Sequence, residues 1–129
     1  MDTYLLAIGW WNFLGSLIML GFIFEAFGQK VLNEWTLIFK DKFVLDYWGK
    51  LWCFWASGLN VFFGLMNIMA ADWQYKDVQT FLIWTDVIAY ILFLVLLIWG
   101  LRSGRLASGA YTAMIIFCLW IAWGIWAVS

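Results

Sequence analysis

The segment LWCFWASGLNVFFGLMNIMAA, residues 51–71, carries no charged side chain and is long enough to cross the hydrocarbon core of a bilayer as a helix. At about 100° per residue, its small and polar side chains fall on one stripe, and its large apolar side chains lie on the remaining surface. Helices in lipid associate through small residues and side-chain amides. We therefore expect protein contacts along this stripe, which consists of Cys53, Ala56, Asn60, Gly64, Asn67 and Ala71.

The composition of the whole chain indicates a membrane protein. Hydrophobic residues make up 67% of the 129 residues and charged residues 12%, against roughly 45–50% and about 25% in soluble domains. A soluble fold is therefore excluded. The net charge is −1 and no run of like charge occurs, so the sequence gives no indication of nucleic-acid binding.

Four apolar runs predict an all-α integral membrane protein with a single transmembrane domain over residues 1–129. The connections after the second and third runs are short, which favours four transmembrane helices in an antiparallel bundle. The predicted spans are about 4–27, 51–71, 78–101 and 106–128.

The long connection between the first two spans predicts a short interfacial amphipathic helix. Apolar side chains recur there at helical spacing, but the segment, about 31–48, is too short and too charged to span. We expect its aromatic side chains to lie in the headgroup layer; they include Trp35, Phe39 and Trp48.

One acid lies well inside a predicted span. Asp86 is about 12 Å from the start of the third span at 1.5 Å per residue, and an ionisable residue at that depth suggests a functional site. The spacing from Asp86 to Tyr90 lets the tyrosine hydroxyl approach the carboxyl group, and an amide such as Asn12 or Asn67, or a cation from a partner chain, is an alternative partner for Asp86. Buried amides need hydrogen-bond partners, which are either other helices or a ligand. The candidates for such contacts are Asn12, Asn60, Asn67, Asp86 and Tyr90.

Small residues predict where helices approach one another. They recur on single faces of the first, second and fourth spans, where they permit close backbone contact. The predicted packing residues are Gly9, Ala56, Gly64, Gly109 and Ala113.

The sequence contains few side chains suited to metal binding or redox chemistry. Histidine is absent, and the two cysteines, Cys53 and Cys118, sit in apolar runs without metal-binding spacing. We therefore predict no metal site and no catalytic residue. A bound lipid, quinone or pigment is compatible with the sequence, but the chain supplies no metal ligand of its own for it.

The run from Gly21 through Gly28-Gln29-Lys30-Val31-Leu32 resembles the end of the first helix in the four-helix DoxX-type membrane proteins. The resemblance covers residues 21–32 and implies a four-helix membrane protein. The remainder of that family's pattern is missing, so no functional residue is carried over from it.

Basic residues predict the orientation in the membrane, because short cytoplasmic loops are enriched in lysine and arginine. Six of the seven basic residues lie in the first and third connections, and only Lys76 lies in the second. We therefore expect both termini of this multi-pass protein on the non-cytoplasmic side.

Two classes of function agree with these features. The first is a small non-catalytic subunit of a larger respiratory, photosynthetic or transport complex, packed against other integral membrane subunits, lipids or pigments. It is favoured by the absence of a catalytic motif and of a broken helix of the transporter kind. The alternative is an independent enzyme or carrier for a lipid-like molecule, a sterol, quinone or isoprenoid, with a polar pocket around Asp86.

Overall fold

The computed structural model describes residues 1–23 and 46–129, and in them the chain forms four α-helices. Each contains a window that is long and apolar enough to cross a membrane, which confirms the prediction of four apolar helices. The expected interfacial helix, with Trp35 and Phe39, lies outside the described residues. The helices are α1 (Asp2–Ile23), α3 (Tyr47–Ala70), α4 (Lys76–Arg102) and α5 (Ala110–Val128).

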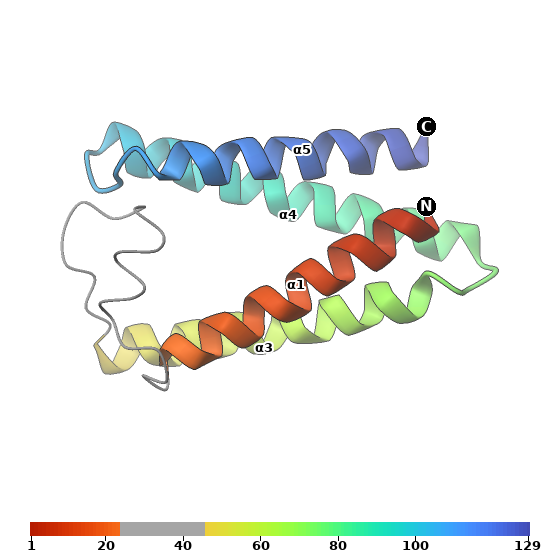
Figure 1. The fold of residues 1–129 in the computed structure, drawn as a ribbon, viewed down its shortest axis with the longest axis horizontal. Helices are drawn as coiled ribbons and strands as arrows, with labels where there is room; N and C mark the ends of the chain where they lie inside the picture. The colour runs from red at the N-terminus through yellow and green to blue at the C-terminus, as the bar shows by residue number, and fades with distance from the viewer. Residues whose placement is uncertain (24–45) are drawn as a thin grey trace.

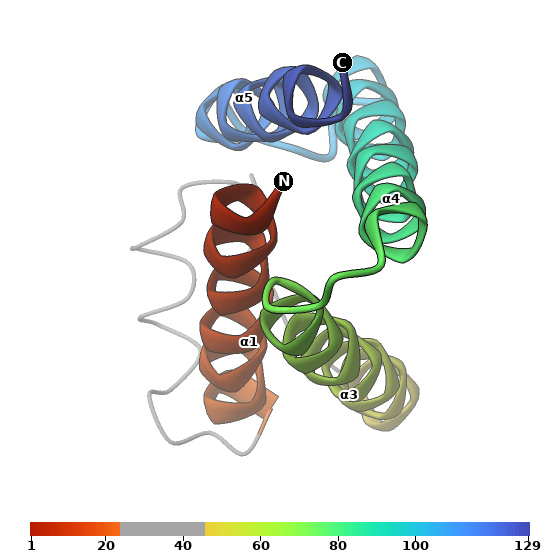
Figure 2. The ribbon, with the colours of Figure 1, turned by 90° about the vertical axis from the view of Figure 1, so that its right-hand side faces the viewer.

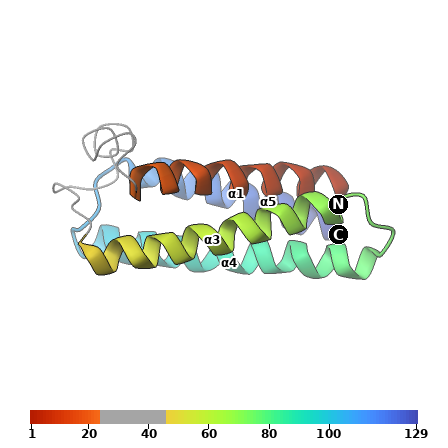
Figure 3. The same cartoon turned by 90° about the horizontal axis from the view of Figure 1, so that it is seen from below.

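The helices associate as two pairs. α1 packs mainly on α3, and α4 packs mainly on α5 (Figure 1). Viewed end-on, the pairs form two layers of one bundle (Figure 2). The N- and C-termini lie at the same end as the α3–α4 connection, and the α4–α5 turn lies at the other end (Figure 3).

Local capping explains why α3 begins earlier than the predicted span. The Asp46 side chain accepts a hydrogen bond from the backbone N–H of Gly49 at 2.6 Å, which satisfies one of the free donors of the first turn. The helix therefore begins at Tyr47. Trp48, which we expected in the interfacial segment, lies in the first turn of α3 and is exposed.

The turn between α4 and α5 is longer than the sequence suggested. The backbone N–H groups of Arg105 and Leu106 both donate to the carbonyl of Gly100, at 3.0 and 3.2 Å, and Gly104 has a φ of 73°. This left-handed conformation favours glycine and ends a helix by satisfying its last carbonyls. The last helix consequently begins at Ala110 rather than near residue 106.

The apolar core lies toward the end of the bundle that carries the termini (Figure 1). It combines the first turns of α1, the last turn of α3 and the first half of α4, and the side chains of Trp120 and Trp123 pack against it. Its buried members are Tyr4, Leu5, Ile8, Ala70, Ala71, Leu82, Ile83, Val87 and Tyr90.

A pair of glycines sets the distance between α1 and α3. A Cβ atom on Gly64 would lie 2.8 Å from the carbonyl oxygen of Gly9 and 2.9 Å from the backbone nitrogen of Phe13. Neither backbone atom can move without moving its helix, so any side chain at Gly64 would separate the pair. Of the other expected packing residues, Gly109 caps α5 and Ala113 is half-buried.

Candidate functional site: a cavity between the helix pairs

A cavity of about 480 Å³ lies between the two helix pairs. α1, α3, α4 and α5 all contribute to its wall. The aromatic part of the lining comes from Trp11, Tyr90, Phe93 and Phe117, and the polar part comes from Asn12, Ser16, Ser57 and Asn60 in addition to the Tyr90 hydroxyl.

A smaller cavity of about 240 Å³ adjoins the first and extends to Asp86. The two share five lining residues, and we call them the larger and the smaller chamber of one interhelical cavity. The shared residues are Asn12, Ala56, Asn60, Tyr90 and Phe93.

The stripe of small and polar side chains on residues 51–71 has two parts in the structure. Toward its end, Gly64, Asn67 and Ala71 are buried against protein. Toward its beginning, Cys53, Ala56 and Asn60 line the larger chamber instead, and Ala56 is exposed to it. One stripe thus provides both a helix contact and a cavity wall.

A hydrogen bond between α4 and α1 fixes one side of the cavity. The Tyr90 hydroxyl donates to Oδ1 of Asn12 at 2.7 Å. The spacing on α4 allowed this hydroxyl to approach Asp86; in the structure it bonds to Asn12, a residue 78 positions away. The Ser16 hydroxyl donates to the backbone carbonyl of Asn12 at 2.6 Å, so Asn12 is held from two directions.

The buried acid is held by an amide. Nδ2 of Asn67 donates to Oδ2 of Asp86 at 2.8 Å, and both side chains are buried. Within the described residues, two buried polar atoms nearby have no hydrogen-bond partner, Oδ1 of Asn67 and the hydroxyl of Tyr4. The Asp86 carboxyl group thus belongs to a polar pair between α3 and α4 and reaches the smaller chamber from there.

Asn60 differs from the other candidate amides. It is half-buried and lines both chambers, and its side chain makes no hydrogen bond within residues 1–23 and 46–129. The Nδ2 group of Asn12 likewise has no acceptor in that part of the chain. Because partly buried amides favour a hydrogen-bond partner, these groups can bind a molecule that enters the cavity.

Sequence reasoning missed the role of Gln79. Its Nε2 group lies within hydrogen-bonding distance of the carbonyl oxygens of Ala70, Ala71 and Trp73, at 2.9, 3.2 and 3.1 Å, and of Oδ1 of Asp2 at 3.1 Å, and these acceptors share its two hydrogens. One side chain thus links the end of α3, the start of α4 and the start of α1. Its place on the same helical face as Asp86 was the available signal.

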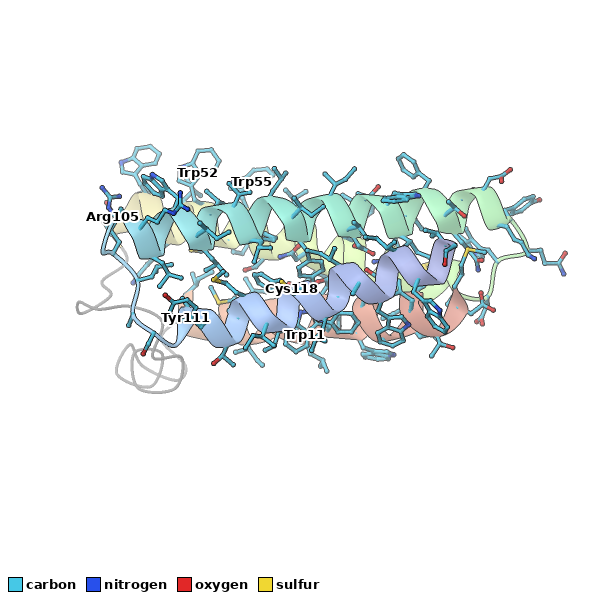
Figure 4. The ribbon with its side chains drawn as sticks, turned by 90° about the horizontal axis from the view of Figure 1, so that it is seen from above. Trp11, Trp52, Trp55, Arg105, Tyr111 and Cys118 are labelled. Carbon is cyan, nitrogen blue, oxygen red and sulfur yellow. The ribbon has the colours of Figure 1, made fainter. Side chains whose placement is uncertain are left out.

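A third hollow, of about 290 Å³, lies between α1 and α5 and is almost wholly apolar. Its wall includes the indoles of Trp11, Trp120 and Trp123, and the last two stack with ring centroids 5.5 Å apart. Figure 4 shows Trp11 beside α5 in this region. Its described lining exposes almost no polar surface that would orient a ligand.

The described residues contain no group of three or more metal-binding side chains of the His, Cys, Asp and Glu types. Cys53 and Cys118 are free thiols. Comparison with protein families, with curated proteins and with solved structures finds no match for this chain.

Proposed function

We propose that this chain is a multi-pass membrane protein that binds a lipid-like molecule in the interhelical cavity. The observation that carries this proposal is the larger chamber, about 480 Å³ in volume, with aromatic walls and the Asn60 amide, which has no hydrogen-bond partner among the described residues. Binding sites for small molecules typically have volumes of about 300–1,000 Å³, mostly apolar walls and a few polar groups that orient the ligand.

The arrangement of the helices suits a ligand that arrives from the bilayer. Each helix packs mainly within its own pair, and the core that joins the pairs lies near the termini. The cavity therefore lies where the pairs are least tightly joined. In this proposal the four helices cross the membrane as an antiparallel bundle with both termini on the non-cytoplasmic side, and the segment 31–48 lies at the interface.

Filling the cavity tests the proposal. Ala56 lines both chambers, so Ala56→Trp should occupy the space and expel the bound molecule. The matched control is Ala122→Trp, because Ala122 is exposed on α5 and lines none of the three hollows. Each protein would be purified in mild detergent and extracted with organic solvent, and the extract analysed by mass spectrometry.

We expect a stoichiometric lipid-like molecule in the wild-type and Ala122→Trp extracts and its loss from Ala56→Trp. Equal amounts in all three would mean that the molecule is carried by the detergent belt, which would refute binding in the cavity. Gel filtration and helical circular dichroism establish that each variant is folded.

A second candidate is a non-catalytic subunit of a larger membrane complex, and one feature favours it. α3 presents a row of large exposed side chains at successive spacings of four, three and seven residues, namely Trp48, Trp52, Trp55 and Phe62. Trp52 is 71% exposed and, like Trp55, points away from the bundle (Figure 4). Such a row matches the spacing at which one helix packs against another.

Purification separates the two candidates. A subunit should copurify with other integral membrane polypeptides in fixed ratio, and Trp52→Ala with Trp55→Ala should release them. A self-sufficient binding protein should be purified alone with its molecule bound. The two tryptophans would then contact only lipid, and their replacement should leave the amount of bound molecule unchanged.

A further inference from the structure

We propose that the larger chamber binds an uncharged, planar ring compound with a carbonyl group, of the quinone type, whose carbonyl oxygen accepts hydrogen bonds from Asn12 and Asn60. This inference rests on the proposed function and adds the chemical class of the ligand. Three properties of the chamber carry it, namely its charge, its free hydrogen-bond donors and its aromatic wall.

Among residues 1–23 and 46–129, no Asp, Glu, Lys, Arg or His side chain lines the larger chamber. Asp86 lines only the smaller chamber, where Asn67 already donates to its carboxyl group. A charged headgroup transferred from water into the larger chamber would have no counter-charge, which is strongly unfavourable. This argues against the anionic phosphate and carboxylate headgroups. An ammonium headgroup could pair only with Asp86, in the smaller chamber, whereas the amides that line the larger chamber suit an uncharged group.

The amides of Asn12 and Asn60 can both present N–H donors to the chamber. The Tyr90 hydroxyl uses its hydrogen on Oδ1 of Asn12, so the free end of the Asn12 amide is its NH₂ group. The Asn60 amide can turn either end toward a ligand. A carbonyl oxygen can accept from both amides at once, whereas a sterol hydroxyl that donates to the Asn60 oxygen could accept only from Asn12.

The aromatic wall suits a flat ring. Tyr90 and Phe117 have ring centroids 5.1 Å apart, and Phe93 lies 6.0 Å from Phe117. The three rings, tilted by 39–57° to one another, thus cluster next to the Asn12–Tyr90 hydrogen bond, and each presents a face or an edge to the chamber. A conjugated ring can stack on such a surface while its carbonyl oxygen reaches the amides, and its apolar tail can extend toward lipid.

The test measures binding of a decyl-substituted benzoquinone to the purified chain by equilibrium dialysis, with protein-free detergent as the baseline. Asn12→Asp keeps an acceptor for the Tyr90 hydroxyl but removes the N–H donors, and Asn60→Leu removes the second amide at similar volume. The control is Phe62→Leu, on an exposed face of α3 outside the cavity. We expect each amide variant to bind about tenfold more weakly, as loss of one good hydrogen bond implies, and the control to bind normally.

Competition distinguishes the ligand classes. Cholesterol and phosphatidylglycerol should not displace the benzoquinone from the wild-type chain. Unchanged benzoquinone affinity in both amide variants would overturn the inference. If Asn12→Asp does not fold, unchanged affinity in Asn60→Leu is sufficient to overturn it. Asn60-dependent binding of cholesterol without benzoquinone binding would refute the ligand class and leave the proposed function intact. Absence of binding of every probe, together with an empty solvent extract, would refute both.

Discussion

The Asn67 amide donates a hydrogen bond to the Asp86 carboxyl group at 2.8 Å and thereby joins α3 to α4 inside the bundle. Asp86 is 6% exposed and Asn67 1% exposed, so each group depends on the other for a hydrogen-bond partner. A carboxyl group at this depth is costly unless it is paired. We therefore interpret the pair as a structural element that also borders the smaller chamber.

The first prediction concerns this pair. Asp86→Asn keeps an acceptor oxygen for Asn67 and should unfold at nearly the wild-type temperature in detergent. Asp86→Leu leaves the buried amide of Asn67 without a partner and should lose about 1–3 kcal/mol of stability. A leucine variant as stable as the wild-type chain would show that the hydrogen bond contributes nothing. A folded asparagine variant without bound molecule would instead assign Asp86 a role in binding.

The second prediction concerns the contact between α1 and α3. Gly64→Leu should push the helices apart, because its Cβ would already lie 2.8 Å from a backbone oxygen. Overpacking of this kind typically costs about 1–3 kcal/mol. Gly58→Leu is the matched control, since a Cβ there has open space on the same helix. Similar thermal stability of the two variants would mean that α1 and α3 do not approach closely at Gly64.

The third prediction concerns Gln79. Gln79→Glu replaces a donor by a carboxyl oxygen among three backbone carbonyls and the Asp2 carboxyl group, and we expect a loss of about 1–3 kcal/mol. Gln74→Glu adds the same charge at an exposed position in the neighbouring connection and should have little effect. Thermal unfolding of both variants checks the expectation. Equal stability would show that Gln79 does not hold the three helices together.

The sequence of each segment, taken alone, was sufficient to predict the four helices and the contact face of α3. Uninterrupted apolar runs predicted four helices, and the 100° periodicity of residues 51–71 grouped Gly64 and Asn67 on a single stripe. The position of Asp86 inside α4 followed from its place in the third run. These features depend on the geometry of a single helix, which a sequence specifies directly.

Relations between helices could not be predicted in the same way. The spacing of Asp86 and Tyr90 suggested a contact within one helix, but Tyr90 bonds to Asn12 because the packing of α4 against α1 brings these side chains together. The cavity beside Asn60 depends on how far the two pairs separate along their length. The periodicity of one segment specifies neither how α4 packs against α1 nor how far the two pairs separate. The early start of α3 was accessible, since Asp46 is a preferred capping residue.

The fourth prediction concerns orientation. In a chain with Cys53→Ala and Cys118→Ala, single cysteines would replace Thr3, Ser129 or Ser103. The termini lie at the opposite end of the bundle from the α4–α5 turn (Figure 1), so positions 3 and 129 should react alike with an impermeant thiol reagent. We expect both to react in intact cells and position 103 to react only after the membrane is opened. The reverse pattern would place both termini in the cytoplasm.

The most direct measurement of the central claim is a density map, at side-chain resolution, of the chain purified in mild detergent. Our account predicts elongated non-protein density in the interhelical cavity, in contact with the Asn60 amide and beside the Tyr90 ring, and its absence from the Ala56→Trp protein. A cavity closed by its own side chains, with no density next to Asn60 in the wild-type protein, would contradict the account.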